Sequence, residues 1–223
     1  MLRFFALLMV VWLIVTVAGV GLLRWVDPPT SAFILHERIT GNHTVRHAWV
    51  DWERIANPLK VAVIAAEDQT FPEHHGFDFK SIDKALAERE RGRRLRGAST
   101  LSQQVAKNLF LWNGRSWLRK GLEAYFTVLI ELTWPKQRIL EIYLNIAEFG
   151  RGVYGVGAAS DIFFGKSAAR LTAYDAALLA AVLPSPKRLR ANAPSRYVRS
   201  RQQWILGQMR GLGGVAIVKR LER

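Results

Sequence analysis

Two adjacent carboxylates at the end of an apolar segment are the first candidates for chemistry. Glu67 and Asp68 follow the apolar run 59–66 and precede the histidine pair His74 and His75. A carboxyl group beside an apolar wall has a raised pKa, which suits a general base or a general acid. A helix terminus with solvated charges has the same pattern, so both interpretations stay open. A metal site on the histidine pair is weaker, because neighbouring histidines seldom face one ion.

A polar helix predicted over residues 99–111 is the second candidate. Ser99 or Thr100 caps it, and Thr100 with Gln103 fits a capping box. A glycine turn that opens a helix with hydroxyl groups, followed by a lysine, suits an oxyanion such as phosphate. The order of residues is not that of a Walker loop, and an ordinary capped polar helix is the alternative.

The face that this helix would present to a ligand is polar. Thr100, Gln104 and Lys107 lie at i, i+4 and i+7, and therefore on one side. Leu101 and Val105 lie on another side, where they can pack inward. The spacing therefore predicts a helix with one buried apolar side and one side available to a charged ligand.

A pair of cations beside a carboxylate is the third candidate. Arg119, Lys120 and Glu123 stand within five residues of one another. Two cations can neutralise a diphosphate, and the carboxylate would lie next to it. Arg119 and Glu123 are also at i, i+4, so an ordinary surface pair that stabilises a helix by about 0.2–0.5 kcal/mol is the alternative.

The sequence carries a formal net charge of +14 and no cysteine. Such a basic excess indicates a polyanionic partner, which can be nucleic acid, an anionic membrane surface or a phosphorylated substrate. A solvated surface that is merely basic is the alternative. The lack of cysteine excludes a disulfide and a thiolate metal site.

The N-terminus contains a segment long enough to cross a bilayer. Residues 4–23 hold no charged side chain and are flanked by Arg3 and by Arg24 with Trp25. About 20 apolar residues span the hydrocarbon core as a helix, and a tryptophan beside an arginine is typical of a membrane interface. A signal peptide usually has a shorter apolar region, and a buried soluble helix usually keeps a polar face. The flanking charges leave the orientation undetermined, and no second span of this length follows.

Most of the remaining sequence predicts helices. Pro28 and Pro29 mark a linker, and no alternating strand or internal repeat is evident. The charge-dense segment 84–97 predicts a solvated, mobile loop, and the four glycines of 150–157 predict a turn-rich connection. The expected helices are a short one within 32–57, an apolar one over 59–67, those over 99–111, 119–133 and 136–147, one capped by Thr172 and Asp175 and ended by Pro184 and Pro186, and one near Trp204.

Five motifs occur in an order that resembles the peptidoglycan glycosyltransferases of glycosyltransferase family 51. They are Glu67-Asp68-x-x-Phe71-x-x-His74-x-Gly76, Gly97 to Asn108, Arg119-Lys120-x-x-Glu123, Lys136 to Asn145, and Arg151 to Lys166. The resemblance covers roughly residues 45–200 and is closest to members with one anchor and one catalytic domain. Ala98 and Ser102 replace a common glycine and threonine, and both changes are conservative.

The motif of a penicillin-binding serine, Ser81-x-x-Lys84, is also present. Its Lys-Thr-Gly partner motif is missing, and the chain is too short for an added transpeptidase domain, so the match is attributed to chance.

The resemblance implies a mostly α, lysozyme-like glycosyltransferase domain with one N-terminal transmembrane helix. The expected domains are a membrane anchor over 1–26 with its span at about 4–23, a linker over 27–44, and the catalytic domain over 45–223. The implied location is the bacterial inner membrane, single-pass, with the catalytic domain in the periplasm.

The resemblance also implies the reaction. Lipid II is polymerised into β-1,4-linked glycan strands, undecaprenyl diphosphate is released, and the anomeric centre inverts. The implied partners are lipid II, undecaprenyl-diphosphate-linked glycan, membrane lipids, and proteins of cell division or wall synthesis, but no nucleic acid. A lysozyme-like hydrolase or lytic transglycosylase is the enzymatic alternative, and a basic membrane-bound scaffold or nucleic-acid-binding protein is the non-enzymatic one.

The residues receive roles on the same basis. Glu67 is expected to be the general base. Glu123 is expected beside the diphosphate, where it orients cations or holds a divalent metal (Mg²⁺ or Mn²⁺); no organic cofactor is expected. The expected substrate-binding residues are Asp68, Phe71, His74, Ser99, Thr100, Gln104, Lys107, Arg119 and Lys120; of these, Asp68, Phe71 and His74 are expected mainly to shape the site. Glu141, Tyr143 and Asn145 are expected to form a structural network.

Overall fold

The computed structural model describes the chain except residues 42, 82, 84–86, 88–98 and 223. The loop predicted over 84–97 lies outside the described residues apart from Ala87, and so does Lys84 of the Ser81-x-x-Lys84 motif. The statements below concern the described part.

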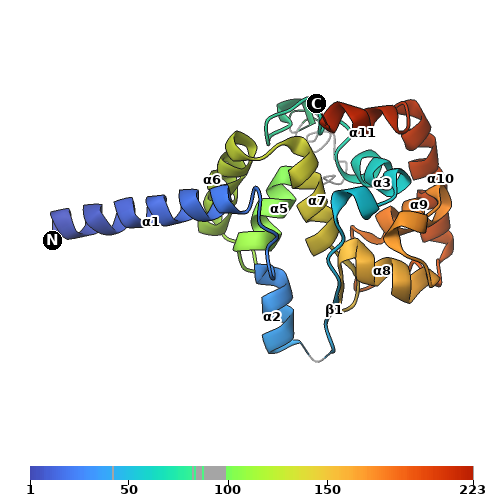
Figure 1. The fold of residues 1–223 in the computed structure, drawn as a ribbon, viewed down its shortest axis with the longest axis horizontal. Helices are drawn as coiled ribbons and strands as arrows, with labels where there is room; N and C mark the ends of the chain where they lie inside the picture. Colours follow the sequence, from blue (N-terminus) through green and yellow to red (C-terminus); the bar gives the residue numbers. More distant parts are fainter. Residues whose placement is uncertain (42, 82, 84–86, 88–98, 223) are drawn as a thin grey trace.

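The fold is mostly helical, as predicted (Figure 1). The helices are α1 (Leu2–Leu22), α2 (Ala32–Thr40), α3 (Asn57–Glu67), α5 (Leu101–Phe110), α6 (Trp117–Thr133), α7 (Lys136–Ile146), α8 (Gly155–Phe164), α9 (Ala173–Val182), α10 (Arg196–Gly211) and α11 (Ala216–Leu221). Two 3₁₀ turns cover Trp52–Arg54 and Ala168–Arg170. The predicted capping boxes of α5 and α9 are both present.

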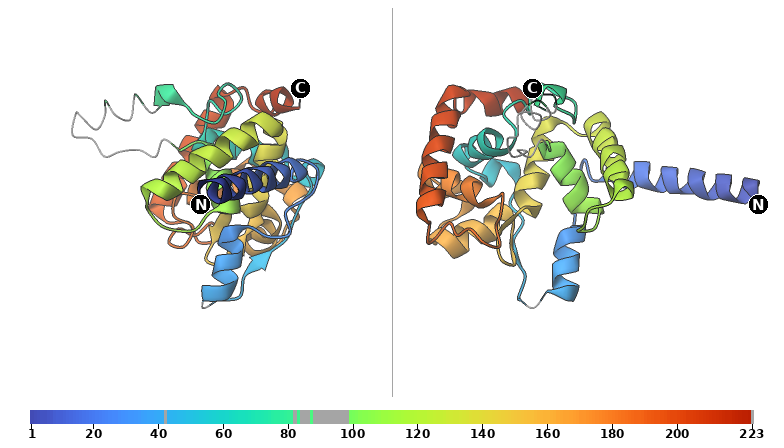
Figure 2. Two further views of the ribbon diagram at one scale, coloured as in Figure 1. Left: turned by 90° about the vertical axis from the view of Figure 1, so that its left-hand side faces the viewer. Right: turned by 180° about the vertical axis from the view of Figure 1, so that it is seen from behind.

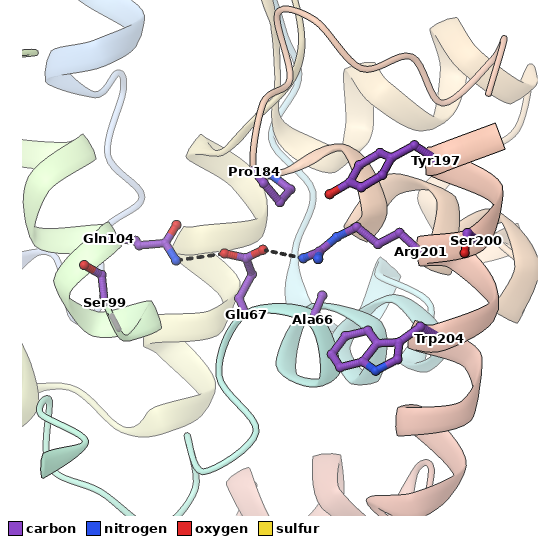
Figure 3. Close-up of a pocket in the computed structure, with 9 residues that line it drawn as sticks. All are labelled: Ala66, Glu67, Ser99, Gln104, Pro184, Tyr197, Ser200, Arg201 and Trp204. Atoms are coloured by element: carbon purple, nitrogen blue, oxygen red, sulfur yellow. Dashed lines mark hydrogen bonds and ion pairs between the residues drawn. The ribbon is translucent and has the colours of Figure 1, made fainter. Parts of the chain in front are cut away.

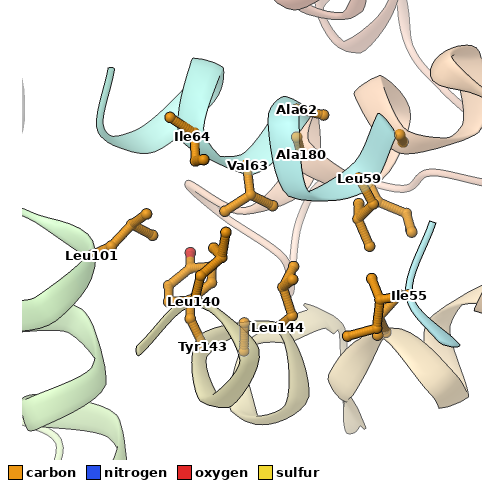
Figure 4. Close-up of a cluster of buried hydrophobic side chains, with 14 of the residues drawn as sticks. Ile55, Leu59, Ala62, Val63, Ile64, Leu101, Leu140, Tyr143, Leu144 and Ala180 are labelled. Carbon is orange, nitrogen blue, oxygen red and sulfur yellow. The ribbon is translucent and has the colours of Figure 1, made fainter. Parts of the chain in front are cut away.

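The helix α3 runs through the centre of the body. Seven consecutive residues, Leu59 to Ala65, are buried, so the helix has no solvent-facing side for most of its length. This explains why the apolar run lacks an amphipathic period. One side of α3 packs on α9 and α10, and Val63 and Ile64 face Leu140 of α7 (Figure 4). The hydrophobic core therefore has α9 and α10 on one side and α5, α6 and α7 on the other, with α3 packed between them.

A small sheet, which the sequence analysis did not predict, lies beside α8. Its strands are β1 (Arg46–His47), β2 (Glu148–Gly150) and β3 (Val153–Tyr154), in the order β1-β3-β2. β1 pairs with β3 in parallel, and β2 pairs with β3 in antiparallel orientation. Strands of two or three residues are too short to show an alternating pattern, so the prediction of no strand was wrong for a physical reason. The predicted turn-rich connection also ends early, because Gly155 already begins α8.

The helix α1 extends away from the body (Figures 1 and 2). It is the one described helix long and apolar enough to cross a membrane. Its C-terminal half contacts α6. The hydroxyl oxygens of Thr16 and Tyr125 lie 2.7 Å apart, and the Trp134 indole donates to the Val20 carbonyl over 2.8 Å. The apolar helix is therefore docked on the body.

An apolar stripe on α6, the helix that α1 contacts, faces solvent. Its exposed members are Leu118, Val128 and Leu132, and the neighbouring Trp117 is 93% exposed. Leu118, Val128 and Leu132 are spaced by ten and four residues, which at 3.6 residues per turn places them on one face of the helix. An exposed apolar face of this kind marks a surface for another apolar phase or partner.

Candidate active site

The carboxylate of Glu67 lies at the last position of α3, beside a cavity of about 770 Å³ (Figure 3). The Gln104 amide donates to Glu67 Oε2 over 3.0 Å, and an Arg201 nitrogen lies 3.9 Å from Oε1. Burial raises the pKa of Glu67, and the Gln104 hydrogen bond and the positive charge of Arg201 partly oppose that rise. A proton acceptor therefore stands at the wall of the cavity, held from two sides.

Three of the predicted substrate-binding residues form the support beneath Glu67. The Asp68 carboxylate accepts from His74 Nε2 over 2.9 Å and from the backbone N–H of Leu101 over 2.9 Å. Phe71 is fully buried, with the Lys136 ammonium 4.6 Å from its ring centre. These contacts join the end of α3 to the start of α5. Asp68, Phe71 and His74 do not line the cavity, and their expected role in shaping the site stays a prediction.

Thr100 and Ser99 occupy different environments at the start of α5. The Thr100 hydroxyl accepts from the backbone N–H of Gln103 and donates to the Gly76 carbonyl over 2.7 Å, and the residue is only 3% exposed. Its hydroxyl therefore caps and fixes α5, and its expected contact with substrate stays a prediction. Ser99 is exposed and lines the cavity.

Gln104 connects the site to the structural network. Its amide oxygen accepts from the Tyr143 hydroxyl over 3.3 Å, while its amide nitrogen reaches Glu67. Glu141 accepts from the backbone N–H of Trp52, and Asn145 exchanges hydrogen bonds with the backbone of Val50. Glu141 and Asn145 thus hold the backbone of residues 50–52 and have the predicted structural role, whereas the Tyr143 hydroxyl bonds to Gln104.

A cluster of cations surrounds Glu123 in the second turn of α6. Arg119 donates to Glu123 Oε2 over 2.6 Å, Lys120 pairs with Oε1, and Glu123 is 3% exposed. Burial lowers the pKa of Lys107, and the negative charges of Glu123 and Glu67 oppose that shift. The charges of both carboxylates therefore act on Lys107. The four predicted residues Lys107, Arg119, Lys120 and Glu123 thus form one group of interacting charges.

The described residues do not fit a metal site at Glu123. Both of its carboxylate oxygens are held by cations, and no group of three His, Asp or Glu side chains gathers anywhere in the described part of the chain. A divalent ion prefers several oxygen ligands, which this position lacks. Magnesium or manganese stays a prediction, and no step below passes through a metal.

The second wall of the cavity was missed by sequence reasoning. It consists of Tyr197, Ser200, Arg201 and Trp204 on α10, with Pro184 beside them. The α10 residues recur at i, i+3, i+4 and i+7, which places them on one face. That spacing was visible in the sequence, but nothing in it indicated that this face lies opposite Glu67.

The comparisons with known proteins agree with this geometry. A family model described as "Transglycosylase" matches residues 34–210, which include every residue of the site. This chain belongs to the transglycosylase family. A relative named "Biosynthetic peptidoglycan transglycosylase" from Klebsiella oxytoca is 57% identical over 97% of this chain and 93% of its own length. Relatives of the same name from Stutzerimonas stutzeri and Pseudomonas aeruginosa are 54% and 56% identical, over 96% and 93% of this chain and 91% and 92% of their own lengths.

This transglycosylase is therefore an enzyme of cell-wall biosynthesis that polymerises peptidoglycan glycan strands. The match at nearly full length includes the segment of α1. The family resemblance inferred from the five motifs is confirmed.

Proposed function

We propose that this transglycosylase uses lipid II as substrate and forms β-1,4 links with inversion and release of undecaprenyl diphosphate. The observation that carries the proposal is the pairing of one carboxylate with one group of cations. Glu67, a partly buried carboxylate with a raised pKa, lines the cavity. Lys107, whose charge lowers the pKa of Glu67, belongs with Arg119 and Lys120 to a group of three cations on α5 and α6 that Glu123 orders.

Glu67 is the general base. It accepts the proton of the attacking sugar hydroxyl while that oxygen forms the new bond to the anomeric carbon. A proton affinity above that of an ordinary glutamate brings the base closer to the pKa range in which proton transfer is efficient at neutral pH. Gln104 and Arg201 favour the ionised form enough to keep the base available and fix its orientation.

The cation cluster serves the leaving group. When the anomeric bond breaks, its electron pair goes to the diphosphate oxygen, and the added negative charge must be neutralised in place. Inversion requires that base and leaving group act on opposite faces of the sugar. A hydrolase that acts on finished glycan has no diphosphate to neutralise, so the cluster favours the transferase.

The N-terminal helix is proposed as the single-pass anchor in the bacterial inner membrane, with the catalytic domain in the periplasm. The docked α1, the exposed stripe on α6 and the net charge of +14 together favour a domain that works against an anionic bilayer. A substrate with a lipid tail can then reach the cavity without leaving the membrane.

The test is an assay of the purified full chain on labelled lipid II in detergent micelles. We expect glycan polymer that lysozyme digests, with undecaprenyl diphosphate released in equal amount to the links formed. Finished glycan offered alone should stay intact. Cleavage of finished glycan without polymer from lipid II would instead establish the hydrolase.

A further inference from the structure

Two aromatic side chains stand on the α10 wall of the cavity and have no role in the mechanism above. Tyr197 and Trp204 lie seven residues apart on the same face, on either side of Arg201 (Figure 3). Tyr197 is 58% exposed and Trp204 is 47% exposed, so neither belongs to the core. Large aromatic surface left open in a cavity beside a catalytic carboxylate indicates a ligand.

The membrane does not explain these aromatic residues. Tryptophan and tyrosine also collect at bilayer interfaces, but that interface must lie near α1. The front and back views, in which the longest axis is horizontal, both place α10 at the opposite end of the body from α1 (Figures 1 and 2). An aromatic pair at that distance from the anchor is not an interfacial belt.

The polar groups between the two rings match the edge of a sugar. Arg201 and Ser200 both line the cavity, and the Arg201 side chain, 23% exposed, has no hydrogen bond to Glu67, from which its terminal nitrogen lies 3.9 Å away. The Arg201 guanidinium carbon lies 5.9 Å from the centre of the Trp204 ring. A pyranose has an apolar face of C–H groups and a rim of hydroxyl and amide oxygens, so an aromatic face beside an unused donor is complementary to it.

We propose that Tyr197 and Trp204 form a saccharide-stacking platform that binds a pyranose ring of the peptidoglycan glycan, with Arg201 donating to its rim. The inference rests on the proposed function and extends it to the sugar part of the substrate. Charge supports the assignment. The three cations that suit a diphosphate all lie on the α5–α6 side of Glu67, whereas Arg201 is the one basic residue among those that line the described cavity and it is directed at Glu67.

The first experiment measures binding without catalysis. The full chain in detergent is titrated by calorimetry with a lipid-free tetrasaccharide of alternating N-acetylglucosamine and N-acetylmuramic acid. Trp204→Ala should weaken binding about tenfold, the scale of one lost aromatic contact, and Tyr197→Ala should weaken it by a smaller factor. Trp112→Ala and Tyr174→Ala are matched controls, because both side chains are exposed and neither lines the cavity.

Replacements at Trp204 distinguish two contributions to sugar affinity, stacking on an aromatic ring and contact with any apolar side chain of similar volume. Trp204→Phe keeps a ring and should recover most of the affinity, whereas Trp204→Leu keeps only apolar volume and should not. Melting temperatures of all variants show that each is folded. Equal affinity of the Leu and Phe variants, wild-type affinity of Trp204→Ala, or failure of the wild-type chain to bind the tetrasaccharide at millimolar concentration would overturn the platform.

Kinetics then identify the source of the bound sugar. If the platform holds the growing strand, Trp204→Ala should slow extension of a preformed lipid-linked glycan more than the first coupling of two lipid II molecules. If it holds the incoming disaccharide, the KM for lipid II should rise equally in both reactions. An unchanged rate in both contradicts the platform. Failure of the wild-type chain to polymerise lipid II would contradict the proposed function instead, whatever the tetrasaccharide result.

Discussion

The environments of Glu67, which is partly buried, and Glu123, which is buried, differ in the number of direct partners of each carboxylate. Glu123 has a cation on each oxygen, whereas Glu67 has one neutral amide within hydrogen-bond distance and an arginine 3.9 Å away. Burial without a close counter-charge raises the proton affinity of Glu67. The comparison teaches that neighbours alone can suit the same residue type to accept a proton in one place and to hold cations in the other.

The largest expected effect is that of Glu67→Gln on turnover. The amide is nearly isosteric but cannot accept the proton, so kcat should fall on the order of 10²–10⁴-fold. Binding of lipid II should persist, and equilibrium binding beside single-turnover kinetics measures both. Loss of binding together with turnover would show that the variant damages the cavity rather than the chemistry.

Stability sharpens the same comparison. Because the pKa of Glu67 is raised by folding, its contribution to stability is present at low pH and declines as pH rises through the folded-state pKa. Glu67→Gln removes that decline, so at neutral pH its melting temperature should equal or exceed that of the wild type.

Lys107→Ala should have the next largest effect. Loss of a positioned cation at the leaving group should lower kcat/KM about 10²-fold, with little change in melting temperature. Lys120→Ala is the matched control, because that lysine is half-exposed and should cost less. Steady-state kinetics of both variants decide the point, and a normal kcat/KM for Lys107→Ala with a large loss of stability would assign Lys107 to the scaffold.

Glu123→Gln should impair both activity and folding. The substitution leaves Arg119 buried without its counter-charge, which should lower the free energy of unfolding by about 3 kcal/mol. Turnover should fall about tenfold through misplaced cations. Chemical denaturation measures the first effect. A variant that is as stable as Glu67→Gln would remove the distinction between the two carboxylates.

The smallest effect concerns the contact between α1 and α6. The hydroxyl pair of Thr16 and Tyr125 should couple the two helices by about 0.6 kcal/mol, the mean for hydrogen bonds between membrane helices. A double-mutant cycle of Thr16→Val and Tyr125→Phe, followed by unfolding in detergent, measures that coupling. Zero coupling energy would mean that this contact does not fix the orientation of the catalytic domain relative to α1.

Much of the site could be predicted because its residues are close in sequence and their spacing has a local meaning. The capping box of Thr100 and Gln103 and the pairing of Arg119 with Glu123 both follow from helical geometry. The helical body follows from apolar runs and caps in the same way. The raised pKa of Glu67 followed from the apolar run before it.

The rest depends on tertiary packing that no local pattern encodes. Arg201 reaches Glu67 from α10, more than a hundred residues later in the chain. Thr100 lies on the predicted polar face, yet its hydroxyl donates to the Gly76 carbonyl, because the segment that follows α3 passes beside the start of α5. The strands are too short to leave a signal, and the docking of α1 needs a partner surface on α6.

The most direct test of Glu67 as the base is the pH dependence of kcat/KM for lipid II in the wild type and in Gln104→Ala. A base must be ionised, so activity should fall as pH decreases, with its acid limb above the ordinary glutamate value of 4.5. The Gln104 hydrogen bond lowers the pKa of Glu67, so its removal should shift that limb to higher pH. An acid limb at or below the ordinary value, or one that Gln104→Ala leaves in place, would contradict the assignment of Glu67 as the base.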